Sequence, residues 1–490
     1  MSTLSGYRWL AHHYGLEPAQ PFLTPARLPS TRPADTLAGH LTFAFKYEGV
    51  HLECLSRLFV LLPVQELEVW LAQEPSGQYA RRAGFFYEWL TGQRLAFAGV
   101  TVGNYVNVLN PQHYFTAHTA TNNPRWRVRD NLLGTAAYCP LIRRTAAIQA
   151  AETYDCAQHL QHLEQAYGED LLIRSAVWLT VKESLASFTL EHEGQQTDRV
   201  QRFATAMERH CGQAPTPLAA DFLTALQREI LGDKATRYGL RRSPVFVGEV
   251  QGFLPVVHYI APHWDDTPAL LAGLATVEQR TRGQASVLRA ALLAFGFVYL
   301  HPLVDGNGRV SRFLVNDILR RDGVMPAPYI LPVSATINRN PAARRAYDQA
   351  LEAFSRPLMQ RYRGQYAFGE EQEAADGVRY NLHFHAYADA LHAWRYPDLT
   401  AQTEYLAEVV AQTLEQEMRE EAVYLQTMRQ ARLAIKALLE APDADIDRII
   451  RSIRENPAGL SRKIQKEYPA LQDAALGAAM VAVVRRYWSD

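Results

Sequence analysis

The twelve residues HPLVDGNGRVSR, from His301 to Arg312, combine groups that could act together on a phosphate. His301 has the side chain best suited to accept a proton near neutral pH. Asp305 offers a hard oxygen ligand that suits Mg²⁺. The glycine-rich turn that opens the next predicted helix presents backbone N–H groups at the positive end of the helix dipole. The stretch therefore predicts a base, a metal ligand and a phosphate-binding turn in one loop.

Arg309 and Arg312 lie three residues apart, so they share one face of the predicted helix over 309–322. Their repulsion requires an anion or an acidic partner close by. A simpler interpretation is a helix–loop–helix corner in which Gly306 and Gly308 only permit the turns. The combination of residue types favours a functional site over such a corner.

The elements that must position this loop are mostly helices. Apolar periodicity predicts amphipathic helices between about 145 and 194 with a joint at Gly168, and a nearly all-apolar, buried helix over 285–300. Val and Phe runs on both sides of Gly248 and Gly252 predict a β-hairpin over 241–260. Further helices are predicted over 197–210, 218–231, 267–281 and 339–357. We expect a mainly α fold with one hairpin, and a linker in the charged stretch 369–377.

Composition restricts the class of protein. The 490 residues allow two or three domains, and 50 basic against 51 acidic side chains give no chain-wide positive field, so nucleic acid is not an expected partner. Four dispersed cysteines predict buried free thiols. The N-terminus does not resemble a secretory signal, and the apolar stretch 285–300 is too short to span a membrane. We expect a cytoplasmic protein without a membrane partner.

The motif resembles the signature of Fic domain proteins, His-Pro-Phe-x-Asp/Glu-Gly-Asn-Gly-Arg-x-x-Arg, and departs from it only at Leu303, where the family usually has Phe. The apolar helix before the motif and the upstream hairpin also resemble the family's core. The resemblance covers roughly residues 145–360. It implies a Fic-type helical core over 141–365 with 241–260 as its flap, flanked by mostly helical regions of unknown role at 1–140 and 366–490.

The resemblance implies transfer of AMP from ATP to a Ser, Thr or Tyr hydroxyl of a target protein. His301 would be the base, and Asp305 would hold Mg²⁺ on the α and β phosphates. Arg309 would neutralise the leaving pyrophosphate, and Arg312 would bind the γ-phosphate. The target would dock on the flap hairpin by β-addition. The phosphates would be bound by backbone N–H groups and the Asn side chain of three residues: Gly306, Asn307 and Gly308.

A second resemblance concerns regulation. Thr189-Leu-Glu-His-Glu193-Gly194 is similar to the family's inhibitory motif, Ser/Thr-x-x-x-Glu-Gly/Asn, and lies on the predicted helix over about 170–194. It implies autoinhibition by pairing of Glu193 with Arg312. The alternative is an exposed carboxylate on a helix that ends at Gly194. A partial match around Glu48 lacks the hydroxyl residue and lies much further from the motif, so we prefer Glu193 and leave a contribution of Glu48 open.

Other functions stay open at this point. The same site could remove AMP or transfer another phosphate-containing group, or the core could be silent in a helical binding protein. The sequence does not determine the target protein, the nucleotide or the oligomeric state, and a homo-oligomer stays an open alternative. Three histidines indicate packing at a helix start more than a metal site: His383, His385 and His392. A basic run indicates a solvated helix face: Arg451, Arg454, Arg462, Lys463 and Lys466.

Overall fold

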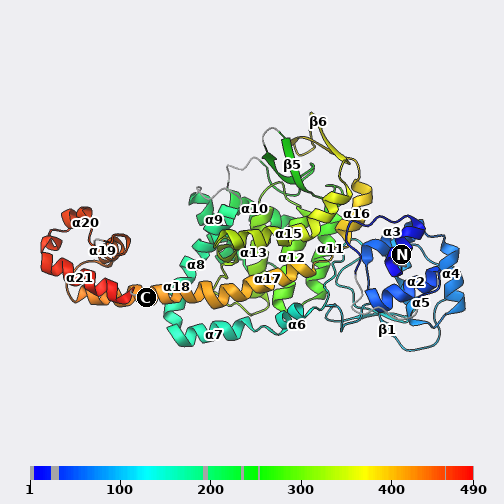
Figure 1. Cartoon of the computed structure of the whole chain (residues 1–490), viewed down its shortest axis with the longest axis horizontal. Coiled ribbons are helices and arrows are strands. Elements are labelled where there is room, and N and C mark those ends of the chain that lie inside the picture. The colour runs from blue at the N-terminus through cyan, green and yellow to red at the C-terminus, as the bar shows by residue number, and fades with distance from the viewer. Residues whose placement is uncertain are drawn as a thin grey trace.

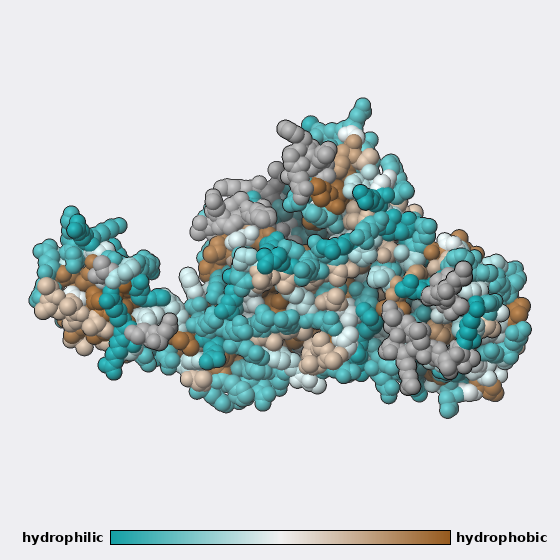
Figure 2. Space-filling model, viewed as in Figure 1, coloured by the Kyte–Doolittle hydropathy of each residue, from teal (hydrophilic) through white to brown (hydrophobic). Residues whose placement is uncertain are grey.

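A computed structural model of the chain describes residues 5–23, 32–190, 197–232, 237–251, 254–457 and 459–488. This part of the chain is mainly helical (Figure 1), which confirms the predicted fold class. Within it, no helix combines the length and the apolar character that a membrane span needs. Figure 2 shows a largely hydrophilic face with scattered apolar patches. The four cysteines are buried and free, as predicted.

The N-terminal region is a cluster of helices followed by long loops and a small sheet. Strand β3 pairs with β1 in parallel and with β2 antiparallel. Apolar side chains of these elements form a hydrophobic cluster around the fully buried Trp126. The helical elements are α1 (Gly6–Tyr14), α2 (Leu37–Phe43), the π-helical turn η1 (Ala44–Glu48), α3 (Leu52–Leu61), α4 (Val64–Gln73) and α5 (Gln78–Thr91). The strands are β1 (Val106–Asn107), β2 (Thr121–Asn123) and β3 (Val128–Asp130).

The central part is built around α12 (Ser286–Leu300), which is apolar on nearly every side and buried, as its sequence predicts. It packs against α13 (Asn307–Arg321) and α11 (Thr267–Arg280), which has Pro268 in its first turn. The predicted joint at Gly168 is confirmed, with a φ of 89° between two helices. The other helices here are α6 (Ala146–Thr153), α7 (Cys156–Tyr167), α8 (Glu169–Leu190), α9 (Thr197–His210), α10 (Ala220–Leu231), α14 (Val333–Ile337) and α15 (Pro341–Arg361).

Two β-hairpins lie beside each other above this core in Figure 1. The predicted hairpin is present as β4 (Phe246–Gln251) and β5 (Leu254–Ile260). The predicted linker at 369–377 is wrong, because β6 (Tyr366–Glu373) and β7 (Arg379–Phe384) form a second antiparallel pair there. Strand β6 is rich in exposed Glu, which favours strands poorly. Pairing with β7 and the contact of the Phe368 ring with the Phe246 ring, 5.5 Å between centroids, override that weak propensity.

The rest of the chain is helical. Helix α17 packs on α12 and joins the central hydrophobic cluster, although it lies beyond residue 365, where the core was expected to end. The end of α18 with α19 and α21 forms a separate small cluster, which lies apart at one end of the molecule in Figure 1. The elements are α16 (Tyr387–Arg395), α17 (Thr400–Gln412), η2 (Thr413–Glu417), α18 (Met418–Lys436), α19 (Asp443–Glu455), α20 (Arg462–Glu467), η3 (Pro469–Gln472) and α21 (Ala474–Tyr487).

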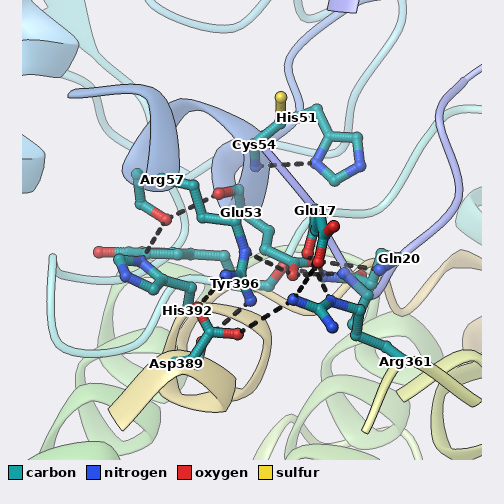
Figure 3. A network of polar contacts seen from close by, with 12 residues as sticks. Glu17, Gln20, His51, Glu53, Cys54, Arg57, Arg361, Asp389, His392 and Tyr396 are labelled. Carbon is teal, nitrogen blue, oxygen red and sulfur yellow. Dashed lines mark hydrogen bonds and ion pairs between the residues drawn. The ribbon is translucent and has the colours of Figure 1, made fainter. Parts of the chain in front are cut away.

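A buried polar network joins the N-terminal helices to the core (Figure 3). Arg57 on α3 forms ion pairs with Glu53, at 3.1 Å, and with Asp389 on α16, at 2.7 Å. It also donates a hydrogen bond to the Tyr362 hydroxyl at the end of α15. The carboxylate of Glu53 accepts hydrogen bonds from the backbone N–H groups of Ala19 and Gln20. The charges are therefore satisfied inside the junction, which a buried ion pair requires to be stable.

Candidate active site

His301 lies at the end of α12 in the left-handed conformation, with a φ of 47°. This conformation is rare for a residue with a side chain, and it persists only where neighbours hold it. The His301 N–H donates to the Phe297 carbonyl at 2.9 Å, and the His301 carbonyl accepts from Arg241 Nε at 2.7 Å. Imidazole Nδ1 lies 3.2 Å from the Val298 carbonyl oxygen. A proton on Nδ1 in that contact leaves the basic lone pair on Nε2.

Arg241 fixes the segment before the flap to the motif loop. It is 2% exposed, and its guanidinium also donates to the carbonyls of Ser243 and Pro262, at 3.0 and 2.7 Å. Its backbone N–H donates to the Pro302 carbonyl at 3.0 Å. Desolvation lowers the pKa of Arg241 to about 10. Hydrogen bonds of Arg241 thus connect the base of the flap with His301.

The loop after His301 is closed by Asn307. Its side-chain oxygen accepts from the Leu303 N–H, and its side-chain nitrogen donates to the Leu303 carbonyl, both at 2.9 Å. Both ends of the Asn307 amide thus bind the loop backbone, and the amide keeps one further N–H, so the expectation that it also contacts a phosphate stays a prediction. Gly306 has a φ of 83° and precedes the first turn of α13, as the sequence indicated. The first backbone N–H groups of a helix have no partner within the helix, which is the arrangement that suits an anion.

Asp305 and Arg309 face each other at the start of α13. Asp305 Oδ1 lies 2.9 Å from Arg309 NH2, and the Asp305 carboxyl is 52% exposed. Gln227 on α10 donates to the Asp305 backbone carbonyl at 2.8 Å and so holds this residue from behind. Arg309 is 2% exposed, and its guanidinium lies over the Phe188 ring of α8, 4.9 Å from the centroid. The arginine is therefore oriented by a carboxylate on one side and a ring on the other.

Arg312 lies one turn further along α13 and is held by α8. Its Nε donates to the Ser187 hydroxyl at 2.7 Å, and its NH2 donates to the Ser187 carbonyl at 3.1 Å. Glu183, one turn earlier on α8, is fully buried and accepts from the Ser334 N–H and hydroxyl, at 2.6 and 2.5 Å. Burial raises the pKa of Glu183 to about 7, although the Ser334 hydrogen bonds and the Arg312 charge oppose the shift.

The predicted inhibitory segment is only partly described. Glu193 and Gly194 lie outside the described residues, so their pairing with Arg312 stays a prediction. Thr189 lies near the end of α8, where its hydroxyl donates to the Leu185 carbonyl of its own helix at 2.8 Å. Glu48 belongs to the N-terminal hydrophobic region, where its carboxylate accepts from the Tyr7 N–H at 2.9 Å.

The second hairpin supports the flap. Asp376, in the turn between β6 and β7, accepts hydrogen bonds from the Arg242 N–H at 2.7 Å and the Ser243 hydroxyl at 2.9 Å. Partial burial opposes ionisation of Asp376, but these bonds and one from the Val378 N–H lower its pKa overall. On the flap itself, Phe246 and Val247 are exposed. The flap thus exposes two apolar residues at the start of β4, next to a base that Asp376 fixes.

The other charged groups do not form a further metal site. Among the described residues, no three His, Cys, Asp or Glu side chains are grouped so that they could hold an ion. His392 instead contacts the Ser56 hydroxyl at 2.8 Å, and burial lowers its pKa to about 4. A magnesium ion shared with nucleotide phosphates needs only one or two protein carboxylates. The half-exposed Asp305 carboxylate at the start of α13 fits that requirement.

Sequence reasoning missed the residues that position the motif. Arg241 stands beside the exposed Arg242, and nothing in the sequence distinguishes the two. Gln227 lies on the amphipathic helix α10, and Glu183 and Ser187 lie on α8, where no motif distinguishes them. One feature of the sequence could have identified Glu183. It interrupts the mostly apolar stretch of α8, and a carboxylate at such a position is expected to lie inside the core.

Three comparisons with known proteins bear on this site. Residues 217–319 match the sequence model of the Fic/DOC family. Protein adenylyltransferase fic-1 of Caenorhabditis briggsae is 32% identical over 119 residues, which are 24% of this chain and 22% of the relative. Protein adenylyltransferase Fic of Drosophila mojavensis is 33% identical over 107 residues, 21% of this chain and 19% of the relative. The matched segment thus spans about a fifth of these relatives. A solved structure of a Fic family protein from Desulfovibrio desulfuricans G20 aligns with 67% of this chain and 90% of its own, at 18% identity and a TM-score of 0.38.

Proposed function

Because residues 217–319 form a Fic/DOC family domain, we propose that this protein transfers AMP from ATP to a Ser, Thr or Tyr hydroxyl of a target protein. One observation carries the proposal. Twelve residues, from the end of α12 to the start of α13, contain the His301 imidazole, the Asp305 carboxylate, a helix N-terminus and two buried arginines. This is the set of groups that a nucleotidyl transfer requires, since such catalysis consists chiefly of positioning and electrostatic stabilisation.

His301 acts as the general base. The target hydroxyl oxygen attacks the α-phosphorus, the bond from that phosphorus to the pyrophosphate breaks, and the hydroxyl proton passes to His301 Nε2. The contact of Nδ1 with the Val298 carbonyl supports this assignment, because it fixes the ring and directs the lone pair to Nε2. Arg241 keeps the ring in place through the His301 carbonyl.

The first turn of α13 binds the phosphates. Its backbone N–H groups and the adjacent Arg309 place positive charge where the leaving pyrophosphate gains negative charge. Asp305 is the residue that would hold Mg²⁺, which supplies charge neutralisation on the phosphate oxygens when bound. Its exposed carboxylate, held through Oδ1 by Arg309, supports this role.

Autoinhibition is part of the proposal. Helix α8 already binds Arg312 through Ser187, and Glu193 follows Ser187 by six residues. A carboxylate from this segment would compete with the γ-phosphate for Arg312.

A target segment would add as a strand to the flap, whose β4 exposes Phe246 and Val247.

The test of the base is His301→Ala, which should lose transfer of labelled AMP while ATP binding persists, because the imidazole handles the proton and the loop holds the phosphates. The exposed His162→Ala on α7 is the matched control and should transfer AMP like the wild type. Parallel loss of binding and transfer in a folded His301→Ala protein would contradict the assignment. Asp305→Ala should weaken the Mg²⁺ dependence of ATP binding.

The test of autoinhibition is Glu193→Gly, which should raise self-modification by AMP well above the wild type, whereas Glu48→Gly should not. Adding Arg312→Ala to Glu193→Gly should cancel the gain, because the activated state depends on the released arginine. Equal AMP incorporation by the wild type and a folded Glu193→Gly protein would refute the inhibitory role.

A further inference from the structure

A cavity of about 580 Å³ lies within the N-terminal region, and its lining comes from residues 23–143 with no contribution from the Fic/DOC domain. Its walls are η1, the start of α5, β1 with the loop after it, and β3. The volume falls within the range of small-molecule sites. Nothing in the proposed AMP transfer uses this cavity.

Arg82 on α5 lines the cavity and is only 8% exposed. Its guanidinium lies over the Phe45 ring, 4.9 Å from the centroid, and its Nε is enclosed without a hydrogen-bond partner. No carboxylate of the described residues forms an ion pair with it. Burial lowers the pKa of Arg82, and the nearby hydroxyls of Tyr7, Tyr114 and Tyr79 only partly oppose that shift. Among the described residues, no carboxylate therefore neutralises this buried charge.

The environment of Arg57, another buried arginine of this chain, can be compared with that of Arg82. Arg57 is about as buried, at 6% exposed, but two carboxylates and a tyrosine hydroxyl surround it. Arg57 thus has the environment of a structural arginine. Arg82 lacks that environment, and an unpaired buried charge costs folding free energy. A bound anion would compensate the charge of Arg82.

The rest of the lining suits an anionic ligand with a ring. Lys46 and Arg129 add two cations to Arg82, and Glu48 is the single carboxylate of the lining; Arg143 also lines the cavity but forms an ion pair with Asp398 at 2.9 Å. Burial raises the pKa of Glu48 to about 7, so its charge is reduced near neutral pH. Four tyrosines and a phenylalanine supply aromatic faces: Phe45, Tyr47, Tyr79, Tyr105 and Tyr114.

One wall of the cavity is rigidly built. Gly49 has a φ of 96°, and a Cβ at this position would lie 2.2 Å from the Tyr114 hydroxyl. The same hydroxyl accepts the Val50 N–H at 2.8 Å. The chain after η1 can approach Tyr114 only because residue 49 lacks a side chain, so this part of the cavity is fixed before a ligand arrives.

We propose that this cavity is a second ligand site, which binds a small phosphate monoester carrying an aromatic ring. Arg82 pairs with the phosphate, since a guanidinium fork matches phosphate oxygens in a bidentate way. The tyrosine rings contact the aromatic part. Phosphate fits the lining better than a carboxylate because its second charge matches the additional cations at the cavity.

The test is calorimetric titration of the full chain with phenyl phosphate, without Mg²⁺ and at low salt. The wild type should bind, and Arg82→Met should bind at least tenfold more weakly. Arg312→Ala should bind like the wild type, which separates this site from the AMP-transfer site. Absence of binding by the wild type, equal binding by Arg82→Met, loss of binding by Arg312→Ala, or benzoate binding as tightly as phenyl phosphate would each overturn the proposal.

Stability gives an independent readout. Arg82→Met keeps the apolar contact with Phe45 and removes the unpaired charge, so its melting temperature without ligand should equal or exceed that of the wild type. A marked fall would show that Arg82 is a structural residue and would overturn the proposal. Should Arg82→Met not fold, the exposed Arg129→Ala variant replaces it in the titration, with binding of phenyl phosphate expected to weaken severalfold. Unchanged binding there would also overturn the proposal.

Discussion

Replacing Glu183 by Gln should stabilise the protein above pH 7 and destabilise it slightly near pH 4. The Glu183 carboxyl is fully buried, and its pKa is raised from 4.5 to about 7. Between these two values the folded state keeps a proton that the unfolded state releases. The contribution of Glu183 to stability is therefore greatest below pH 4.5, falls as the pH rises, and is constant above 7.

The size of the effect follows from the pKa values. The difference between 4.5 and about 7 corresponds to about 3 kcal/mol. Gln has one acceptor oxygen in place of two, so one Ser334 bond is weakened at a cost of about 1 kcal/mol. Glu183→Gln should thus be more stable than the wild type by about 2 kcal/mol at pH 8, and less stable by about 1 kcal/mol at pH 4.

The assay is urea unfolding of both proteins at pH 4, 6 and 8, with near-UV circular dichroism as the probe. The difference between the two proteins isolates Glu183 from other groups with shifted pKa values, such as Glu48. The exposed Glu420→Gln variant is the control and should stay within about 0.5 kcal/mol of the wild type at each pH. A Glu183→Gln protein that is less stable than the wild type at pH 8, or whose difference does not change sign with pH, would refute the reasoning.

Two further predictions concern the junction and the flap. Arg57→Met should lower the free energy of unfolding by about 3–5 kcal/mol, because it leaves the buried Glu53 carboxylate without its cation; an unchanged denaturation midpoint would argue against this. Asp376→Ala should raise the KM for the protein target and leave the KM for ATP unchanged, because the base of the flap loses two hydrogen bonds. Steady-state kinetics measures both constants. A raised KM for ATP with an unchanged KM for the target would show that Asp376 acts on the nucleotide. The lowered pKa of Asp376 also means that its contribution to stability is present above pH 4 and is lost on acidification.

The sequence predicted the helices and the flap because their periodicity is a local property. Helix α12 is apolar on all sides and is buried, and the hairpin β4–β5 follows from Val and Phe runs broken by glycines. The hairpin β6–β7 was missed because its stability depends on pairing and on the Phe246–Phe368 contact, which the charged sequence of β6 does not reveal.

The site was predictable as a set of residues but not as a geometry. Motif spacing placed His301, Asp305 and the arginines within twelve residues, and the structure pairs Asp305 with Arg309. It could not show that the Asn307 amide closes the loop, that Arg241 holds the His301 carbonyl, or that Ser187 holds Arg312. The Arg241 and Ser187 contacts join residues that are far apart in the sequence. The Asn307 contact closes a turn, and only packing in the folded protein decides the direction of that turn.

The position of the transferred label tests the central claim most directly. Glu193→Gly protein is incubated with ATP labelled either at the α-phosphorus or at the γ-phosphorus, and protein-bound label is counted after removal of free nucleotide. AMP transfer predicts that the α label stays on protein, that the γ label does not, and that adding His301→Ala abolishes the α label. Retention of the γ label would show phosphate transfer in place of AMP transfer, and retention of neither label by the folded protein would contradict nucleotidyl transfer altogether.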